Sequence, residues 1–267
     1  MKTNLRILAI LAHPDDESLG FGGTLAKYAN EGVETYLITA TRGERGRFGD
    51  ATESPGFDIV GKTRTQEVLA ASKILGIKEV HFLDYIDGDL DKAPPQEAIE
   101  KIAKLIRKIQ PHVILTFDPF GSYGHPDHIA ISQLSMGGIL AANAKSETDN
   151  SLPWTVSKFY YMAWPPELVS AYETAFKKLA FNVDGNIRIA TPWPNWSITT
   201  KIDTAKYWEQ VWEAINCHQT QISIYNKLKD LSDDNHQHLW GDQSFYRVFS
   251  TVSGGRNLET DLFEGLR

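Results

Sequence analysis

The chain has 267 residues, of which 42% are hydrophobic and 23% charged, so it can close one sizeable core without disulfides. The formal net charge of −7, without a long Lys or Arg run, argues against nucleic acid as a partner. Cys217 is the only cysteine, which excludes an intramolecular disulfide and favours the cytoplasm. No segment approaches the roughly 18 unbroken apolar residues of a membrane span. We therefore expect a substrate that is met in water, and a homo-oligomer is compatible with the sequence.

Short apolar runs alternate with helical patterns in the first half of the chain. Strands are predicted at Arg6–Ala12, Glu34–Thr39, Glu79–Leu83 and His112–Phe117. Helices are predicted at Lys62–Leu75, which Gly76 follows, and at Pro95–Ile109, which Pro111 follows. This alternation predicts an α/β fold with a mainly parallel sheet and helices on both faces. Ligands in such folds bind at the carboxyl ends of the strands.

From Ser151 onward the pattern loosens into aromatic and Pro-rich stretches, before an amphipathic helix near Thr204–His218. Neither repeats nor a clean linker interrupt this half. We therefore interpret residues 1–267 as a single domain, in which 1–150 form the core α/β half with the chemical motifs. Residues 151–267 are expected to continue the same domain, with loops that wall the site.

The first chemical segment, His13–Glu17, reads His-Pro-Asp-Asp-Glu and follows the first predicted strand directly. A histidine nitrogen and an aspartate oxygen are good zinc donors, and a tight turn can bring His13 and Asp16 onto one ion. Asp15 would then point elsewhere and could take a proton from water as the general base of a hydrolysis. The competing interpretation is an acidic turn that caps a helix.

A glycine-rich stretch, Gly20-Phe21-Gly22-Gly23, follows the same strand and resembles a dinucleotide-binding loop only faintly. In such a loop a helix N-terminus receives a pyrophosphate. Here three acidic side chains would repel that anion and attract a cation. We therefore reject nucleotide binding at this position.

The second chemical segment, residues 118–128, follows the fourth predicted strand and ends in His-Pro-Asp-His. In a doubly wound sheet the first and fourth strands commonly lie side by side, so this segment could face the first one and supply a third ligand. Three protein ligands and one open position are typical of catalytic zinc. One of His125 and His128 would bind the metal and the other would face the substrate, which spacing alone does not decide. Asp127 is the candidate to orient the substrate-facing ring.

Other chemically capable residues are interpreted as structural or are left open. His236 and His238 lie in an acidic run that we expect to be a solvated loop. Cys217 lacks a base that could reach its sulfur, and we expect it to be buried. His218 and Gln221 could either pack structurally or line a pocket.

With both segments in view, the chain resembles the LmbE-like (PIG-L) family of zinc-dependent N-deacetylases. The hallmark segments of that family correspond to Ala12–Glu17 and His125–His128. The likeness extends over most of the chain, through Thr41–Gly46, Arg64–Glu67 with Leu75-Gly76, Asp87-Gly88 and His218–Gln221. The resemblance implies a Rossmann-like three-layer α/β sandwich, in agreement with the strand pattern.

The same resemblance implies that His13, Asp16 and His128 bind one zinc ion per chain and that Asp15 is the general base. Fe(II) or Co(II) could occupy the same ligand set. His13→Ala or His128→Ala should then lose the metal, whereas Asp15→Ala should abolish turnover with the metal still bound.

The remaining implied roles concern the substrate. His125 would stabilise the tetrahedral intermediate with Asp127 in support, and Arg64 and Asp87 would contact sugar hydroxyls. The predicted function is removal of an N-acetyl or other acyl group from a small amino sugar or glycoside, which releases acetate and a free amine. One alternative is an amidase for a larger amide, such as a thiol conjugate of an amino sugar. The other is a sugar-binding relative without catalysis.

Overall fold

The structure is a computed structural model that describes residues 4–146, 150–176, 180–183, 185–252, 255 and 257–267. Its central sheet contains the strands β1 (Arg6–Leu11), β2 (Glu34–Thr41), β3 (Ile77–Tyr85), β4 (Val113–Thr116), β5 (Lys158–Met162), β8 (Thr200–Asp203) and β9 (Asp242–Ser250). Their order across the sheet is β3-β2-β1-β4-β5-β9-β8. The first five are parallel, and β9 runs antiparallel to both β5 and β8. A separate hairpin pairs β6 (Ala180–Val183) with β7 (Asn186–Ile189).

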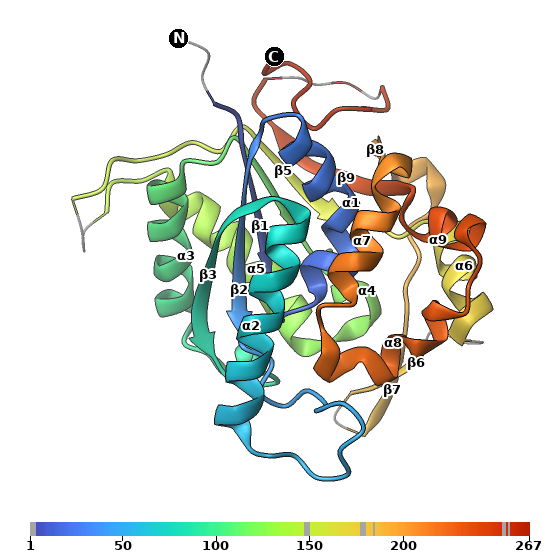
Figure 1. Ribbon diagram of the computed structural model, residues 1–267. Coiled ribbons are helices and arrows are strands. Elements are labelled where there is room, and N and C mark those ends of the chain that lie inside the picture. The colour runs from blue at the N-terminus through green and yellow to red at the C-terminus, as the bar shows by residue number, and fades with distance from the viewer. Residues whose placement is uncertain (1–3, 147–149, 177–179, 184, 253–254, 256) are drawn as a thin grey trace.

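Helices cover both faces of this sheet, which makes three layers (Figure 1). They are α1 (Asp16–Asn30), α2 (Phe57–Leu75), α3 (Pro95–Ile109), α4 (Gly121–Gly124), α5 (Pro126–Ala142), α6 (Pro166–Phe176), α7 (Trp208–Ile215), α8 (Ile222–Lys229) and α9 (Asp233–Trp240). On one face α1 and α2 pack together and against α7, and α3 packs against α5 on the other. None of the helices in the described ranges is both long and apolar enough to cross a membrane.

The predicted strands of the first half are confirmed to within a few residues at their ends. β1 lies between β2 and β4, with Ile7 paired to both Thr35 and Val113, so the first and fourth strands are neighbours as expected. The helix Pro95–Ile109 is confirmed at both ends. The helix predicted from Lys62 begins earlier, at Phe57. The α/β fold with a mainly parallel sheet is therefore as the sequence predicts.

In the second half, one expectation is confirmed with shorter bounds and another is wrong. The amphipathic helix predicted near Thr204–His218 is α-helical at Trp208–Ile215, with short 3-10 turns on either side. The solvated loop predicted around His236 is helix α9. The His236 ring is buried and stacks against Trp212 and Trp240, with its Nε2 2.7 Å from the carbonyl oxygen of Leu228. Aromatic packing from distant helices, which the local acidic run does not reveal, buries this histidine.

A buried ion pair ties the end of the chain to the sheet. The Nζ atom of Lys158, on β5, donates to the Glu259 carboxylate at 2.7 Å, and both side chains are almost fully buried. Tyr160 and Thr200 also donate to Glu259, and Arg247 forms a second ion pair with it. The carboxylate therefore bridges β5, β8 and β9.

Replacing Glu259 by Gln should destabilise the fold by about 3–5 kcal/mol, because it leaves a buried ammonium without its carboxylate. Chemical denaturation would measure this. Glu167→Gln is the matched control, since Glu167 forms an exposed ion pair with Lys201 and its loss should cost about 1 kcal/mol at most. Equal stability of the two variants would contradict the structural role of the buried pair.

Candidate active site

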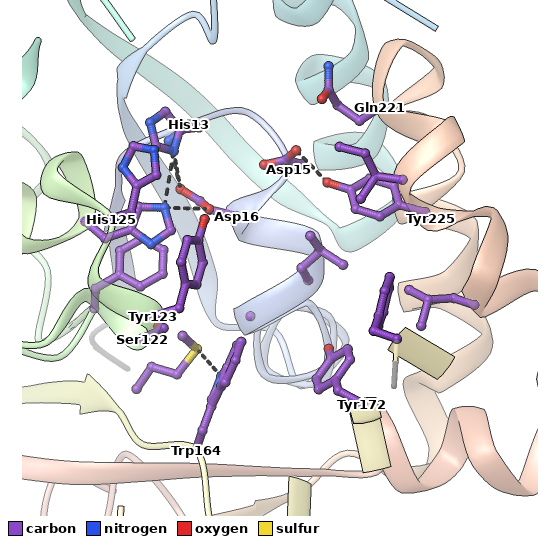
Figure 2. A pocket seen from close by; sticks show the side chains of 18 of the residues that line it. His13, Asp15, Asp16, Ser122, Tyr123, His125, Trp164, Tyr172, Gln221 and Tyr225 are labelled. Atoms are coloured by element: carbon purple, nitrogen blue, oxygen red, sulfur yellow. Dashed lines mark hydrogen bonds and ion pairs between the residues drawn. The ribbon is translucent and has the colours of Figure 1, made fainter. Parts of the chain in front are cut away.

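Two segments that lie far apart in the sequence meet at the carboxyl ends of β1 and β4. His13 follows β1, Asp16 begins α1, and His128 lies in the first turn of α5. Nδ1 of His13 lies 3.2 Å from Nε2 of His128. The Asp16 carboxylate oxygens lie 3.6 Å from His13 Nδ1 and 3.4 Å from His128 Nε2. The structure thus brings the three predicted ligands into one buried cluster, part of which is visible in Figure 2.

The His128 ring is held by the loop between β4 and α5. Phe117, at the end of β4, stacks on this ring with centroids 3.9 Å apart and planes 10° apart. Gly121 has a φ of +61°, and a Cβ there would lie 2.9 Å from the Cβ of His128. Only glycine lets the loop pass this close to α5 at that backbone angle. Gly121 therefore lets the loop approach a candidate ligand closely.

The Asp16 carboxylate is held by the backbone of the turn before α1. Its Oδ2 accepts hydrogen bonds from the amides of Ala12 and His13, at 3.2 and 2.8 Å. Burial alone would raise the pKa of the Asp16 carboxyl, but the neighbouring His128 and His13 rings lower that pKa to about 2. The group is therefore ionised at neutral pH, the form in which a carboxylate binds a cation.

The other ring nitrogen of His13 faces carboxylates. Nε2 lies 3.0 Å from Asp127 and 3.2 Å from Asp87. Burial opposes the protonation of His13, yet the charge of Asp87 and the hydrogen bonds that the ring donates to both carboxylates raise its pKa well above the usual value. A metal ligand must be the neutral ring, and in that form an N–H that points at a carboxylate fixes the tautomer and leaves Nδ1 to face Asp16 and His128.

Asp127 is placed differently from the sequence expectation that it orients the substrate-facing histidine. Its carboxylate contacts His13 and accepts the backbone amides of Gly88 and Leu90, at 2.7 and 3.1 Å. Only its backbone amide reaches His125, by donating to Nδ1 at 3.2 Å. The carboxylate therefore supports His13, a contact that spans 114 positions and leaves no local signal.

Two groups of described residues have ligand-capable atoms within 4.8 Å of one another: His13 with His125 and His128, and His13 with Asp87 and Asp127. In the second group both oxygens of Asp127 accept backbone amides, whereas in Asp16 only Oδ2 does and Oδ1 faces His128. The first group lines the cavity and lies beside Asp16. We therefore regard His13 and His128 of the first group, with Asp16, as the better fit for a metal ion.

Asp15 adopts a backbone conformation that is rare for a residue with a side chain. Its φ is +105°, and its amide donates to the Glu17 carboxylate at 2.9 Å. Its own carboxylate accepts hydrogen bonds from Arg64 at 3.0 Å and from Tyr225 at 2.6 Å. Burial raises the pKa of the Asp15 carboxyl above its usual value, against the opposing charge of Arg64. A raised pKa makes this carboxylate a stronger proton acceptor.

His125 sits beside the cluster as a neutral ring. Burial, together with the charges of His13 and His128, lowers the pKa of His125 to about 3. Because Nδ1 accepts the Asp127 amide, the single proton of the neutral ring resides on Nε2. The ring therefore keeps one N–H donor while it lines the cavity.

The predicted sugar contacts both line the same cavity, whose volume is about 340 Å³. Arg64 is nearly buried, and its guanidinium donates to Asp15 and to the carbonyl oxygen of Gly43. Asp87 faces His13 and accepts the amide of Arg45 at 3.3 Å. Both side chains are thus anchored to the protein within the cavity wall.

Four residues near the centre were missed or left open by the sequence: Glu17, His218, Gln221 and Tyr225. Glu17 holds the Asp15 amide, and His218 holds Glu17, with Nε2 2.8 Å from Oε1. Tyr225 reaches Asp15 from α8. In the sequence, Glu17 is visible only as a third acidic residue after Asp15 and Asp16. His218 and Tyr225 lie in the C-terminal part of the chain, and only tertiary contacts bring them near Asp15. Gln221 lines the cavity. His218 is fully buried outside the cavity lining, where it contacts Glu17.

The family model described as PIG-L, GlcNAc-PI de-N-acetylase, matches residues 8–137. A 1D-myo-inositol 2-acetamido-2-deoxy-alpha-D-glucopyranoside deacetylase from Rhodococcus jostii is 31% identical over 291 residues, which span 98% of this chain and 98% of the relative. The solved N,N'-diacetylchitobiose deacetylase from Pyrococcus horikoshii superimposes with a TM-score of 0.69 and 22% identity, over 91% of this chain and 83% of that one. A 4-carboxy-2-hydroxymuconate hydratase from Pseudomonas putida gives 0.66 and 20%, over 94% and 99%.

The fold and the site define a class of α/β proteins with a buried histidine and carboxylate centre at the carboxyl edge of a parallel sheet. Within that class, the chain belongs to the PIG-L family of de-N-acetylases. The resemblance seen in the two chemical segments is thereby confirmed. Because the two solved structures are less than 25% identical to the chain, they show the fold alone. One of them is a hydratase, so the reaction must be argued from the site.

Glu17→Gln should lower the kcat of deacetylation by about 10- to 100-fold, because the strained Asp15 backbone loses part of its support. Metal content and KM should change little, since Glu17 contacts neither the ligand cluster nor the cavity. Glu31→Gln, at the other end of α1, is the control. A normal kcat in the Glu17 variant would show that Asp15 is positioned by other contacts.

Proposed function

We propose that the protein is a metal-dependent hydrolase that removes the N-acetyl group from an amino-sugar glycoside. The observation that carries the proposal is the grouping of three ligand-capable atoms, a carboxylate base and a neutral histidine donor in one cavity. Amide hydrolysis uses groups of these kinds: a cation that polarises the carbonyl, a proton acceptor and a hydrogen-bond donor.

His13, Asp16 and His128 would hold the metal. Nδ1 of His13 and Nε2 of His128 lie 3.2 Å apart, and Oδ1 of Asp16 lies 3.4 Å from that His128 nitrogen, so one ion could contact all three side chains. A bound zinc ion lowers the pKa of water towards about 7 and polarises the amide carbonyl, and Fe(II) or Co(II) would suit the same donors.

Asp15 would accept the proton of the attacking water. Its carboxylate is fixed by Arg64 and Tyr225, which leave the second oxygen for the water. Once protonated, the same group can deliver the proton to the departing nitrogen, so the C–N bond breaks and a free amine and acetate are released.

His125 would stabilise the tetrahedral intermediate by donating its Nε2–H to the oxyanion. A neutral donor suffices because the developing charge strengthens the hydrogen bond in a site shielded from water. Asp127 would act on the metal site indirectly, by holding the His13 ring. Its support of His125 is limited to the backbone amide that sets the tautomer.

For the substrate, we infer an N-acetylglucosaminide, because relatives that match the whole chain are named for a 2-acetamido-2-deoxy-glucopyranoside of inositol. Arg64 and Asp87 remain the proposed contacts to sugar hydroxyls. We also propose that residues 1–267 form one domain, since β5, β9 and β8 continue the sheet and α8 walls the site. The single Cys217 supports the proposal of a cytoplasmic protein.

Removal of the metal by a chelator should abolish hydrolysis of N-acetylglucosaminides, and zinc should restore it. His13→Ala and His128→Ala should lose bound metal, measured by elemental analysis, because each removes one of three donors. Full activity in a protein shown to be free of metal would disprove the proposal.

Asp15→Asn should lower kcat by about 10²–10⁴-fold, because the amide cannot accept the proton. Metal content should stay near that of the unmodified protein. Asp91→Asn, at an exposed position outside the cavity, is the matched control. Undiminished turnover in the Asp15 variant would remove this residue from the role of base.

A further inference from the structure

The cavity has a second, apolar half that the proposed chemistry does not use. We define it as the apolar arm, lined by Leu19, Met162, Trp164, Tyr172, Phe176 and Leu228. These side chains come from α1, the end of β5, α6 and α8. The arm is therefore built by the second half of the chain against the first turns of α1.

The wall of the arm is continuous with a packed cluster. Tyr172 and Leu228 are buried members of the apolar cluster beneath α6–α9, and Leu19 and Trp164 pack against it. The Trp164 and Tyr172 rings stack with centroids 5.6 Å apart. Packed aromatic side chains make a preformed surface, which binds a ligand without first paying the entropy of ordering.

The polar groups on the two aromatic rings, Nε1 of Trp164 and the hydroxyl of Tyr172, form hydrogen bonds within the protein. Nε1 of Trp164 donates to the Met162 sulfur at 3.3 Å, and the Tyr172 hydroxyl accepts from Nε1 of Trp240 at 3.3 Å. A sugar ring placed here would lose water from its hydroxyls with few partners to replace it. A hydrocarbon or aromatic group would lose nothing comparable.

We define the polar wall of the cavity as Gln221, Asp15 and the Arg64 guanidinium that donates to Asp15. Figure 2 shows Trp164 and Tyr172 on one side of Asp16, and Gln221 and Asp15 on the other, so the arm lies opposite this wall. In a trans amide the substituents on carbon and nitrogen point in opposite directions. With the carbonyl at the ligand cluster and the sugar toward the polar wall, the acyl group points into the arm.

We propose that the apolar arm binds the acyl group and that the protein hydrolyses N-acyl amino sugars whose acyl chain is longer than acetyl. This inference rests on the proposed function and names its substrate class. Water supplies the oxygen of the released carboxylic acid, its proton goes to the sugar nitrogen, and the C–N bond breaks. Neither an oxidant nor a second substrate is required.

The test compares N-acetyl-, N-butyryl-, N-hexanoyl- and N-octanoylglucosamine with the metal-loaded protein. We expect kcat/KM to rise about three- to fourfold for each methylene buried, until the arm is filled. Acetate, butyrate, hexanoate and octanoate should inhibit in the same order, which measures binding without turnover. A kcat/KM that is highest for acetyl and falls with length would overturn the inference and leave the proposed function intact.

Leu19→Gln should lower the octanoyl-to-acetyl ratio of kcat/KM by about tenfold, because it places an amide in the arm. Leu140→Gln, at an exposed position of α5, is the matched control and should leave the ratio unchanged. An equal ratio in the two variants would contradict the assignment of the arm.

A second series keeps N-acetyl and compares methyl with octyl glycosides of N-acetylglucosamine. Gains that follow the glycoside instead of the acyl group would overturn the inference, since the arm would then hold the aglycone. If none of these compounds is hydrolysed, that result would count against the proposed function itself. Direct binding of octanoate, measured by calorimetry, would then still test the arm.

Discussion

The pairing of β1 with β4 is the constraint on which the rest of the structure depends. These strands lie side by side and parallel, so the turns after them meet at one edge of the sheet, although about a hundred residues separate them. Both strands are buried along their length, which fixes their register through apolar packing. A shift of one residue would turn His13 away from His128 and dissolve the ligand cluster.

Electrostatics give this edge its chemical character. Asp16, Asp87 and Asp127 surround the His13 ring, and Asp15 lies beside them with Arg64. Burying several carboxylates is costly unless cations and hydrogen-bond donors compensate them. Histidines, backbone amides and an arginine supply part of that compensation, and a divalent cation would supply more. Arg64 holds the Asp15 carboxylate, and the Asp87 and Asp127 carboxylates hold the His13 ring.

Division of labour between the two halves follows from the topology. The first half of the chain supplies the ligand cluster and the proposed base, whereas side chains of β5, α6 and α8 line the rest of the cavity. Since a hydratase shares this fold, the sheet alone does not select a reaction. The side chains at the sheet edge would select the chemistry, and the walls from the second half would select the substrate.

The sequence by itself determined the alternation of strands and helices, the two segments that carry the chemistry and the family. These signals are local, because apolar periodicity and motif spacing are written into short stretches of chain. Only the tertiary structure decided that the Asp127 carboxylate supports His13, that Glu17 and His218 stand behind Asp15, and that His236 is buried among tryptophans. Each of these depends on contacts between residues far apart in the sequence or on packing between helices, which leave no periodic pattern to read.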